Sequence, residues 1–236
     1  MTQVATITHR QSRFTLACRD VVDASGHKHA ANGQFGSGGS AKAEDKPKKK
    51  LGNAAEKPAA VGKPVNNPDE FEKKHYSKWQ EGLSPIEKDA VKRYTGGSYY
   101  LINKALRDGT NFKKPEYATI ANSLDAILAK TSAPETFETY RAVGPGVLDK
   151  LQIGKTFTDK GFLSTSLKLG AFTPTEGSTH AIMHITVPKG AKGAAISQLS
   201  EEQDEHEFLL PRNSKIVISA IKQNKGISHV YATVKN

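Results

Sequence analysis

The hydrophobic period of the chain changes within residues 115–143, PEYATIANSLDAILAKTSAPETFETYRAV. Pro115 begins this stretch, and proline is favoured in the first turn of a helix. The apolar residues that follow lie on one face of a helix: Ile120, Leu124, Ile127 and Leu128. Beyond Pro134 apolar residues alternate with polar ones, as they do in a strand. The stretch therefore predicts a helix that ends before Pro134 and a strand over residues 136–143.

Three further helices are predicted before residue 115. The clearest start is residues 84–87, Ser-Pro-Ile-Glu, which combine an N-cap serine, a first-turn proline and a capping-box glutamate. Gly96-Gly97-Ser98 breaks the helix that starts there. The other two helices are expected over residues 71–79 and from residue 99 to about residue 109.

After Pro134 the period of two continues to the end of the chain. It predicts strands over residues 136–143, 155–159, 161–167, 180–187, 194–198, 205–210, 215–221 and 229–234. Glycine or proline lies at most of the joins between them. Because the helices come first and the strands follow, the order predicts an α+β fold rather than an alternating parallel α/β fold.

The chain has 236 residues and a formal net charge of +10, which is unevenly distributed. Residues 1–64 hold 11 Lys+Arg against 5 Asp+Glu, a net of +6, and residues 65–236 hold the other 23 against 19, a net of +4. Only Phe14 and Phe35 among the aromatic residues precede residue 70. Since a core requires large apolar side chains, we expect the core beyond residue 70.

Residues 24–68 have the composition of a solvated linker, with a glycine-rich run, a lysine cluster at residues 46–50 and several prolines. We therefore divide the chain into an N-terminal segment with a flexible basic linker, residues 1–69, and a folded domain, residues 70–236. Lysine clusters attract nucleic-acid phosphates without sequence preference. No recognised nucleic-acid module accompanies this cluster, so we expect no specific nucleic-acid partner.

The single cysteine, Cys18, excludes an intramolecular disulfide and a cysteine-ligated zinc site. No stretch approaches the roughly 18–20 apolar residues of a membrane span. Residues 1–20 lack the apolar centre of a secretory signal peptide. We expect a protein of a reducing bacterial cytoplasm with no membrane partner.

Three polar motifs lie at predicted strands. Arg141 lies between apolar neighbours, where its guanidinium either binds a phosphate or carboxylate, or belongs to an edge strand and points into solvent. The hydroxyls of Ser164-Thr165-Ser166 either orient a neighbouring group or belong to an ordinary strand. Neither motif decides between its alternatives by itself.

Glu205 and Glu207 form the third motif. In a strand both side chains fall on one face, and such a carboxylate pair suits chemistry that develops positive charge. The alternative is an acidic loop, because Glu201, Glu202 and Asp204 lie just upstream.

The order and spacing of these motifs resemble the R–S–E class of mono-ADP-ribosyltransferases, in the exotoxin-like branch with the clostridial binary-toxin and C3-like enzymes. Other segments are similar to motifs of that branch: Tyr94-Thr95-Gly96 through Tyr99, Ile102-Asn103, Leu106-Arg107, Val187-Pro188-Lys189-Gly190 and Phe208-Leu209-Leu210-Pro211-Arg212. The resemblance covers about residues 70–236. It implies that this domain is catalytic and has a mainly antiparallel core of two β-sheets.

The resemblance also implies roles for the residues of the motifs. Arg141 would hold a phosphate of NAD, Ser164 would bond the catalytic carboxylate, and Glu207 would stabilise the oxocarbenium-like transition state as nicotinamide leaves. Glu205 would activate the acceptor, which the resemblance implies to be an arginine of a protein, because glutamate at this position usually accompanies arginine acceptors. The remaining NAD-site residues would be Tyr99, Asn103, Arg107, Thr165, Ser166 and Phe172, with Thr165 and Ser166 shaping the strand. No metal is implied.

Two departures from the family pattern concern the predicted NAD site. The loop of residues 168–179, which would face the phosphates and nicotinamide, has no arginine, so either the NAD affinity is lower or Arg107 or Lys168 substitutes for one. Lys160-Gly161 stands where the family often has an asparagine, just ahead of the strand with Ser164-Thr165-Ser166. Residues 197–204 would recognise the target.

Residues 29–39 weakly resemble linkers of tailed-phage head proteins. This leaves a second interpretation: a phage protein associated with the capsid, packaged and injected, whose transferase fold is weakly active or idle.

Overall fold

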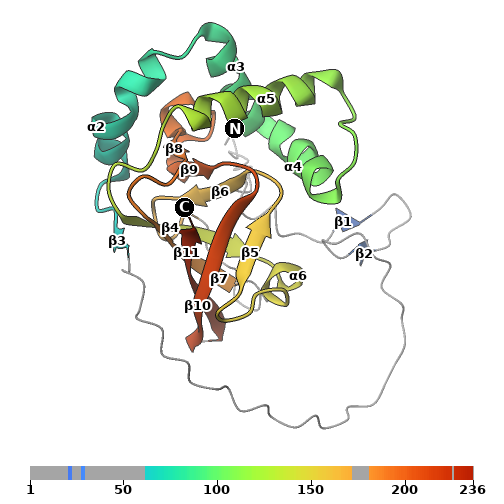
Figure 1. The fold of residues 1–236 in the computed structure, drawn as a ribbon, viewed down its shortest axis with the longest axis vertical. Helices are drawn as coiled ribbons and strands as arrows, with labels where there is room; N and C mark the ends of the chain where they lie inside the picture. The colour runs from blue at the N-terminus through green and yellow to red at the C-terminus, as the bar shows by residue number, and fades with distance from the viewer. Residues whose placement is uncertain (1–20, 23–27, 30–61, 172–180, 225, 236) are drawn as a thin grey trace, which may run out of the picture.

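The structure is a computed structural model that describes residues 21–22, 28–29, 62–171, 181–224 and 226–235. Four helices come first: α2 (Pro68–Glu81), α3 (Pro85–Arg93), α4 (Tyr99–Asp108) and α5 (Pro115–Ala129). Figure 1 shows them gathered at one end of the molecule, over β6, β8 and β9. Within the described residues, no helix is long and apolar enough to cross a membrane.

The helix boundaries follow the signals in the sequence. Ser84 is the N-cap of α3, and its side chain and that of Glu87 form the expected capping box. Between α3 and α4 the chain stays wound through the π-helical turn η1 (Tyr94–Ser98), but Gly97 has a φ of 132°. That conformation is open to glycine and strained for other residues, so the predicted break is confirmed as a kink rather than a loop.

The strands form one connected path in the order β5-β10-β11-β7-β4-β6-β9-β8. Their bounds are β4 (Phe137–Val143), β5 (Thr156–Asp159), β6 (Leu163–Ser166), β7 (Ala181–Val187), β8 (Ala194–Ala195), β9 (Glu207–Leu210), β10 (Ser214–Asn224) and β11 (Ile227–Lys235). Only the β11–β7 pair along this path is parallel. The fold is therefore α+β with a mainly antiparallel sheet, as predicted.

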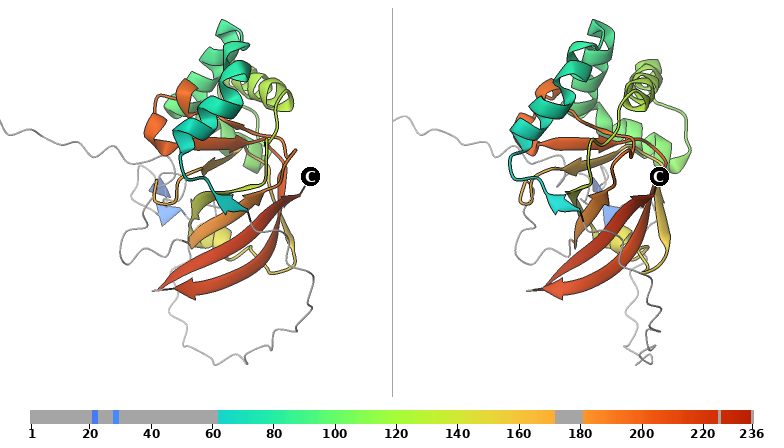
Figure 2. Two further views of the ribbon diagram at one scale, coloured as in Figure 1. Left: turned by 90° about the vertical axis from the view of Figure 1, so that its left-hand side faces the viewer. Right: turned by 60° about the vertical axis from the view of Figure 1, so that its left-hand side comes forward.

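A single residue pair, Tyr140 with Ser166, joins the two halves of this path. On one side lie β5, β10, β11, β7 and β4, and on the other β6, β9 and β8. Figure 2 shows the second group beneath the helices while the β10–β11 hairpin extends away from them. The two groups correspond to the two predicted sheets, and the site motifs lie where they meet.

Three local predictions differ from the structure. Of the strand expected over residues 194–198, only Ala194–Ala195 pairs, and the chain then forms the 3-10 turn η2 (Ser197–Leu199). The strand expected from residue 205 begins at Glu207, because the 3-10 turn η3 (Gln203–Glu205) and a left-handed residue precede it. The four-residue helix α6 (Pro145–Leu148) was not predicted.

The folded part begins before the predicted end of the linker. The strand β3 (Lys63–Pro64) pairs in parallel with the start of β4, and the backbone N–H of Gly62 donates to Thr186 Oγ1 over 3.0 Å. A Cβ at Gly62 would lie 2.3 Å from the carbonyl oxygen of Phe137, so only glycine fits there. Residues 62–64, which the prediction placed in the linker, therefore pair with the folded part of the chain. Earlier in the chain, β1 (Val21–Val22) and β2 (Lys28–His29) pair with each other, and the lysine cluster lies outside the described residues.

The main core lies between the helices and the inner face of the sheet. Its largest fully buried side chains include Tyr76, Tyr94, Phe137, Phe162 and Phe208. Phe137 and Phe208 meet edge to face with ring centroids 5.1 Å apart, which joins β4 to β9. The described core thus begins at Phe71, which is the first aromatic residue of the sequence after Phe35.

A polar chain of hydrogen bonds lies across β4, β7 and β11. Tyr140 donates to Glu138 Oε2 over 3.1 Å, Glu138 Oε1 lies 2.9 Å from His184 Nδ1, and His184 Nε2 lies 2.9 Å from His229 Nδ1. The His184 ring also stacks on Tyr231, with centroids 4.8 Å apart. Burial and the neighbouring His184 lower the pKa of His229.

Acid is therefore expected to destabilise the domain through His229. Unfolded His229 takes up a proton near its ordinary pKa of 6.5, whereas the folded residue resists protonation to a lower pH. The free energy of unfolding should then fall as the pH drops below about 6.5, and the fall should be smaller in His229→Gln. Urea titrations between pH 7.5 and pH 5 measure both slopes. Equal slopes in the two proteins would contradict this assignment.

Candidate active site

Three adjacent strands bring Arg141, Ser164 and Glu207 together. Arg141 on β4 donates from Nη1 to the carbonyl oxygen of Ser164 over 2.6 Å. On β6, the Ser164 hydroxyl donates a short hydrogen bond to Glu207 Oε1 at the start of β9. Arg141 is 9% exposed and Glu207 is fully buried. Ser164 thus contacts the cation through its backbone and the carboxylate through its side chain.

The strand order decides between the two interpretations of Arg141. Its strand, β4, pairs with β7 on one side and with β6 on the other, so it is not an edge strand. The solvent-exposed edge arginine is therefore the wrong alternative. A nearly buried guanidinium requires acceptors around it, and the Ser164 carbonyl is one of them.

Thr165 and Ser166 hold β6 against the segment that carries the two glutamates. The Thr165 hydroxyl donates to the carbonyl of Phe208 over 2.7 Å, and that of Ser166 donates to the carbonyl of Glu205 over 2.7 Å. Both residues are fully buried. Both hydroxyls therefore bond backbone carbonyls of the segment from Glu205 to Phe208, and their place in the NAD site stays a prediction.

The two glutamates do not share a strand face, which corrects the prediction from alternation. Glu205 ends the turn η3, and His206 follows with a φ of 45°, in the left-handed region. Glu207 then opens β9. Because the left-handed residue turns the chain sharply, its conformation sets the relative direction of the two carboxylates, in place of strand periodicity. Glu205 is 7% exposed, so the solvated acidic loop is also wrong for this residue.

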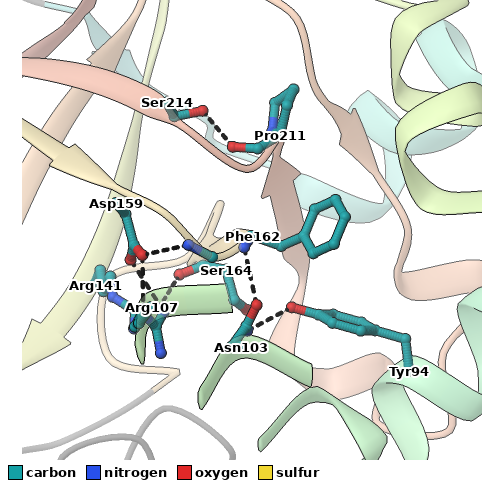
Figure 3. Close-up of polar contacts among 10 residues, drawn as sticks. Tyr94, Asn103, Arg107, Arg141, Asp159, Phe162, Ser164, Pro211 and Ser214 are labelled. Carbon is teal, nitrogen blue, oxygen red and sulfur yellow. Dashed lines mark hydrogen bonds and ion pairs between the residues drawn. The ribbon is translucent and has the colours of Figure 1, made fainter. Parts of the chain in front are cut away.

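Helix α4 supports the start of β6 through Asn103. The Asn103 side chain accepts a hydrogen bond from the backbone N–H of Phe162 and donates one to the Tyr94 hydroxyl, each over 2.9 Å (Figure 3). A Cβ on Gly161 would lie 2.8 Å from Asn103 Oδ1. Asn103 is 5% exposed, so it positions the strand from within the core. Tyr99, one turn earlier, is partly buried and packs edge-on against Tyr94.

Arg107 makes a bidentate ion pair that was not predicted from the sequence. Its Nε and Nη2 donate to the two oxygens of Asp159, over 2.8 and 3.0 Å. Asp159 is 6% exposed and also accepts the backbone N–H of Gly161 over 2.9 Å (Figure 3). An aspartate two residues before a glycine is a turn signal and could have identified this bond. A phosphate bound by Arg107 would therefore have to compete with Asp159.

Two further segments are predicted to belong to the site. Lys168, the other suggested substitute for a second arginine, is exposed at the end of β6. Phe172 and the rest of the loop up to residue 180 lie outside the described residues. Residues 197–204 form η2, the connection after it and the first two residues of η3, and η2 packs against α2 and α3.

The arrangement joins a buried carboxylate, a hydroxyl that fixes it and a guanidinium on the neighbouring strand. A fixed carboxylate can stabilise a developing cation, and a guanidinium can bind phosphate. These are the parts of the R–S–E class of ADP-ribosyltransferases, in the expected order along the chain.

Comparison with protein families agrees with this class. The model of the ADP-ribosyltransferase exoenzyme family matches residues 68–235, and the chain therefore belongs to this family. Among curated relatives, the chain is 32% identical over 151 residues to an NAD(+)–arginine ADP-ribosyltransferase, EFV, of Enterococcus faecalis. It is 36% identical over 139 residues to the NAD(+)–protein-arginine ADP-ribosyltransferase Tre1 of Serratia proteamaculans.

These alignments cover 61% and 58% of this chain but only 31% and 29% of the relatives. The chain thus spans about a third of the length of the curated proteins it matches. Among solved structures, the toxin Plx2a of Paenibacillus larvae superposes with a TM-score of 0.63 at 26% identity, over 72% of this chain and 95% of that one. C3stau2 of Staphylococcus aureus, solved with NAD, has a TM-score of 0.65 at 19% identity, over 75% and 100%. The latter likeness shows the fold alone.

Proposed function

We propose that the chain is an NAD-dependent mono-ADP-ribosyltransferase that transfers ADP-ribose to an arginine of a protein and releases nicotinamide. The observation that carries this proposal is the hydrogen bond from Ser164 to Glu207, with Arg141 bonded to the backbone of the same serine. Family membership and the arginine-specific relatives support the choice of reaction.

The reaction breaks the bond between C1′ of the ribose and the nicotinamide nitrogen, and the electron pair of that bond leaves with nicotinamide. The ribose then carries positive charge, which a carboxylate fixed beforehand stabilises without having to reorganise. Glu207 suits this role because the Ser164 hydrogen bond and complete burial hold its position. Arg141 would hold a phosphate of NAD on the adjacent strand.

Glu205 would serve the acceptor. A guanidinium is a poor nucleophile while it is protonated, so one of its protons must be removed as its nitrogen attacks C1′. The Glu205 carboxylate would accept that proton as the new C–N bond forms. Its separation from Glu207 by one left-handed residue allows two carboxylates to act on different partners.

Incubation with NAD labelled in the adenylate part tests the proposal directly. Wild type should transfer label to an arginine-rich protein acceptor and release nicotinamide, and hydroxylamine should remove the label as it does from arginine conjugates. A protein that consumes no NAD, with and without acceptor, would overturn the proposed reaction. Label that resists hydroxylamine would overturn the choice of arginine.

Arg141→Lys is expected to raise the KM for NAD by about 10- to 30-fold. Lysine keeps the positive charge but cannot bond the Ser164 carbonyl and a phosphate with one planar group, and a lost charge-assisted hydrogen bond costs about 1.5–2 kcal/mol. Steady-state nicotinamide release against NAD concentration measures the change. Arg107→Lys is the matched comparison, and a larger rise in KM there would assign phosphate binding to Arg107 instead.

Association with a phage capsid and injection with the DNA stay predictions. They depend on residues 29–39, of which residues 30–39 lie outside the described part of the chain. Detection of the protein in purified phage particles checks them.

A further inference from the structure

Helix α2 contacts the acceptor side of the proposed site from outside the sheet. The buried Glu72 of α2 accepts the backbone N–H of Gln198 over 2.9 Å and the side-chain amide of Gln80 over 2.7 Å. The same amide of Gln80 donates to the carbonyl of Ala195 over 3.2 Å. Helix α2 therefore fixes the start of the segment that runs from β8 to Glu205.

The same helix contacts the residue between the two glutamates. His206 Nδ1 is buried and lies 3.3 Å from Asp69 Oδ1 in the first turn of α2. The geometry of this contact is not that of a hydrogen bond, and His206 Nδ1 has no hydrogen-bond partner among the described residues. The His206 side chain is 13% exposed, while that of Asp69 is 73% exposed. Asp69 thus covers the imidazole from the solvent side.

The backbone of His206 links both carboxylates to the scaffold. Its N–H bonds to the carbonyl of Gln203 over 3.1 Å, and its carbonyl accepts the N–H of Leu167 over 2.9 Å. Its left-handed conformation is uncommon for a residue other than glycine and must be held by surrounding contacts. Glu205 precedes this residue in η3, whereas Glu207 follows it and is paired in β9 with Ser166.

We propose that His206 is a positioning residue, held by Asp69, which aims Glu205 at the acceptor and so sets the ratio of ADP-ribose transfer to NAD hydrolysis. The inference rests on the proposed function. Its physical basis is that the reaction at NAD uses Glu207 on the strand, whereas acceptor activation uses Glu205 on the turn. A change at the contact between α2 and His206 therefore reaches only the second step.

The test uses Asp69→Asn and His206→Asn in the full chain. Asparagine keeps the size of Asp69 without its charge, and at residue 206 it tolerates the left-handed conformation without supplying the ring. Because a single partly exposed polar contact contributes little, transfer to arginine should fall only about three- to fivefold. NAD hydrolysis and the KM for NAD should stay at wild-type values. Asp149→Asn, at an exposed aspartate beyond α6, is the matched control and should change neither activity.

A second comparison separates positioning from general damage. In a Glu205→Gln background, Asp69→Asn should cause no further loss of transfer, because both changes act through the same carboxylate. An unchanged ratio of transfer to hydrolysis in the single variants overturns the inference, as does an equal loss of both activities. Additive losses in the double variant overturn it too.

Hydrogen exchange tests the contact independently of acceptor chemistry. The backbone N–H of His206 should exchange faster in Asp69→Asn than in wild type, while that of Phe208 in β9 should not change. If wild type fails to label arginine but this exchange pattern is found, the proposed function fails while the contact stands. If the exchange of His206 is unchanged, the positioning role fails, whatever the acceptor is.

Discussion

Glu207→Gln is expected to lower NAD hydrolysis and ADP-ribose transfer together, by about 10²–10³-fold. The amide oxygen of glutamine can still accept the hydrogen bond from Ser164, so the change removes the negative charge and little else. Loss of one fixed electrostatic contact to a transition state typically costs about 3–4 kcal/mol, which corresponds to this decrease. Nicotinamide release and label transfer, measured on the same samples, give both rates.

Thermal unfolding supplies the control for Glu207→Gln. A fully buried carboxylate is costly to desolvate, and a neutral amide of the same shape avoids that cost. We therefore expect the melting temperature of the variant to equal or exceed that of wild type while activity is lost. Normal activity in the variant would remove Glu207 from the proposed chemistry, and a strongly lowered melting temperature would point to a structural role instead.

The α+β order was visible in the sequence because periodicity is a local property. The change of period at Pro134 lies between α5 and β4, and the capping box at Ser84 lies at the start of α3. The strand order was not visible, since it depends on pairing between distant segments. For example, the sequence of neither strand indicates that β11 pairs in parallel with β7.

For the candidate site, too, local features could be predicted from the sequence, whereas contacts between distant segments could not. The order of Arg141, Ser164 and Glu207 identified the site, but the burial of Arg141 depends on its neighbours β6 and β7. Asp159 was missed because its partner, Arg107, is distant in sequence. His206 was missed because residue type alone does not predict a left-handed conformation. This conformation interrupts the strand, so the two glutamates do not share a strand face as expected.

The net charge of the chain indicates little about ligand binding once the contacts of individual cations are known. Residues 1–64 carry a net of +6 and the remainder only +4. Near the site, the charge of Arg107 faces Asp159, whereas Arg141 faces a backbone carbonyl. The overall positive charge is therefore no argument for dinucleotide binding, and the proposed role of Arg141 depends on its position in the site.

Glu205→Gln is expected to separate the two activities that Glu207→Gln removes together. Glutamine cannot accept the proton of an attacking guanidinium, and loss of a general base typically costs 10²-fold or more. Transfer to arginine should fall by about that factor, while hydrolysis persists because Glu207 still stabilises the ribose cation and water can trap it. Parallel assays with and without an arginine-rich acceptor measure the ratio.

Asp149→Asn is the control for Glu205→Gln, because this aspartate is exposed beyond α6 and belongs to no segment of the proposed site. It should leave both activities within about twofold, as expected for a surface substitution worth less than 0.5 kcal/mol. Equal loss of transfer and hydrolysis in Glu205→Gln would assign Glu205 to the step at NAD. Survival of both would show that another group removes the proton. The separation of roles thus depends on the turn at His206, since two glutamates on one strand face would approach the same ribose.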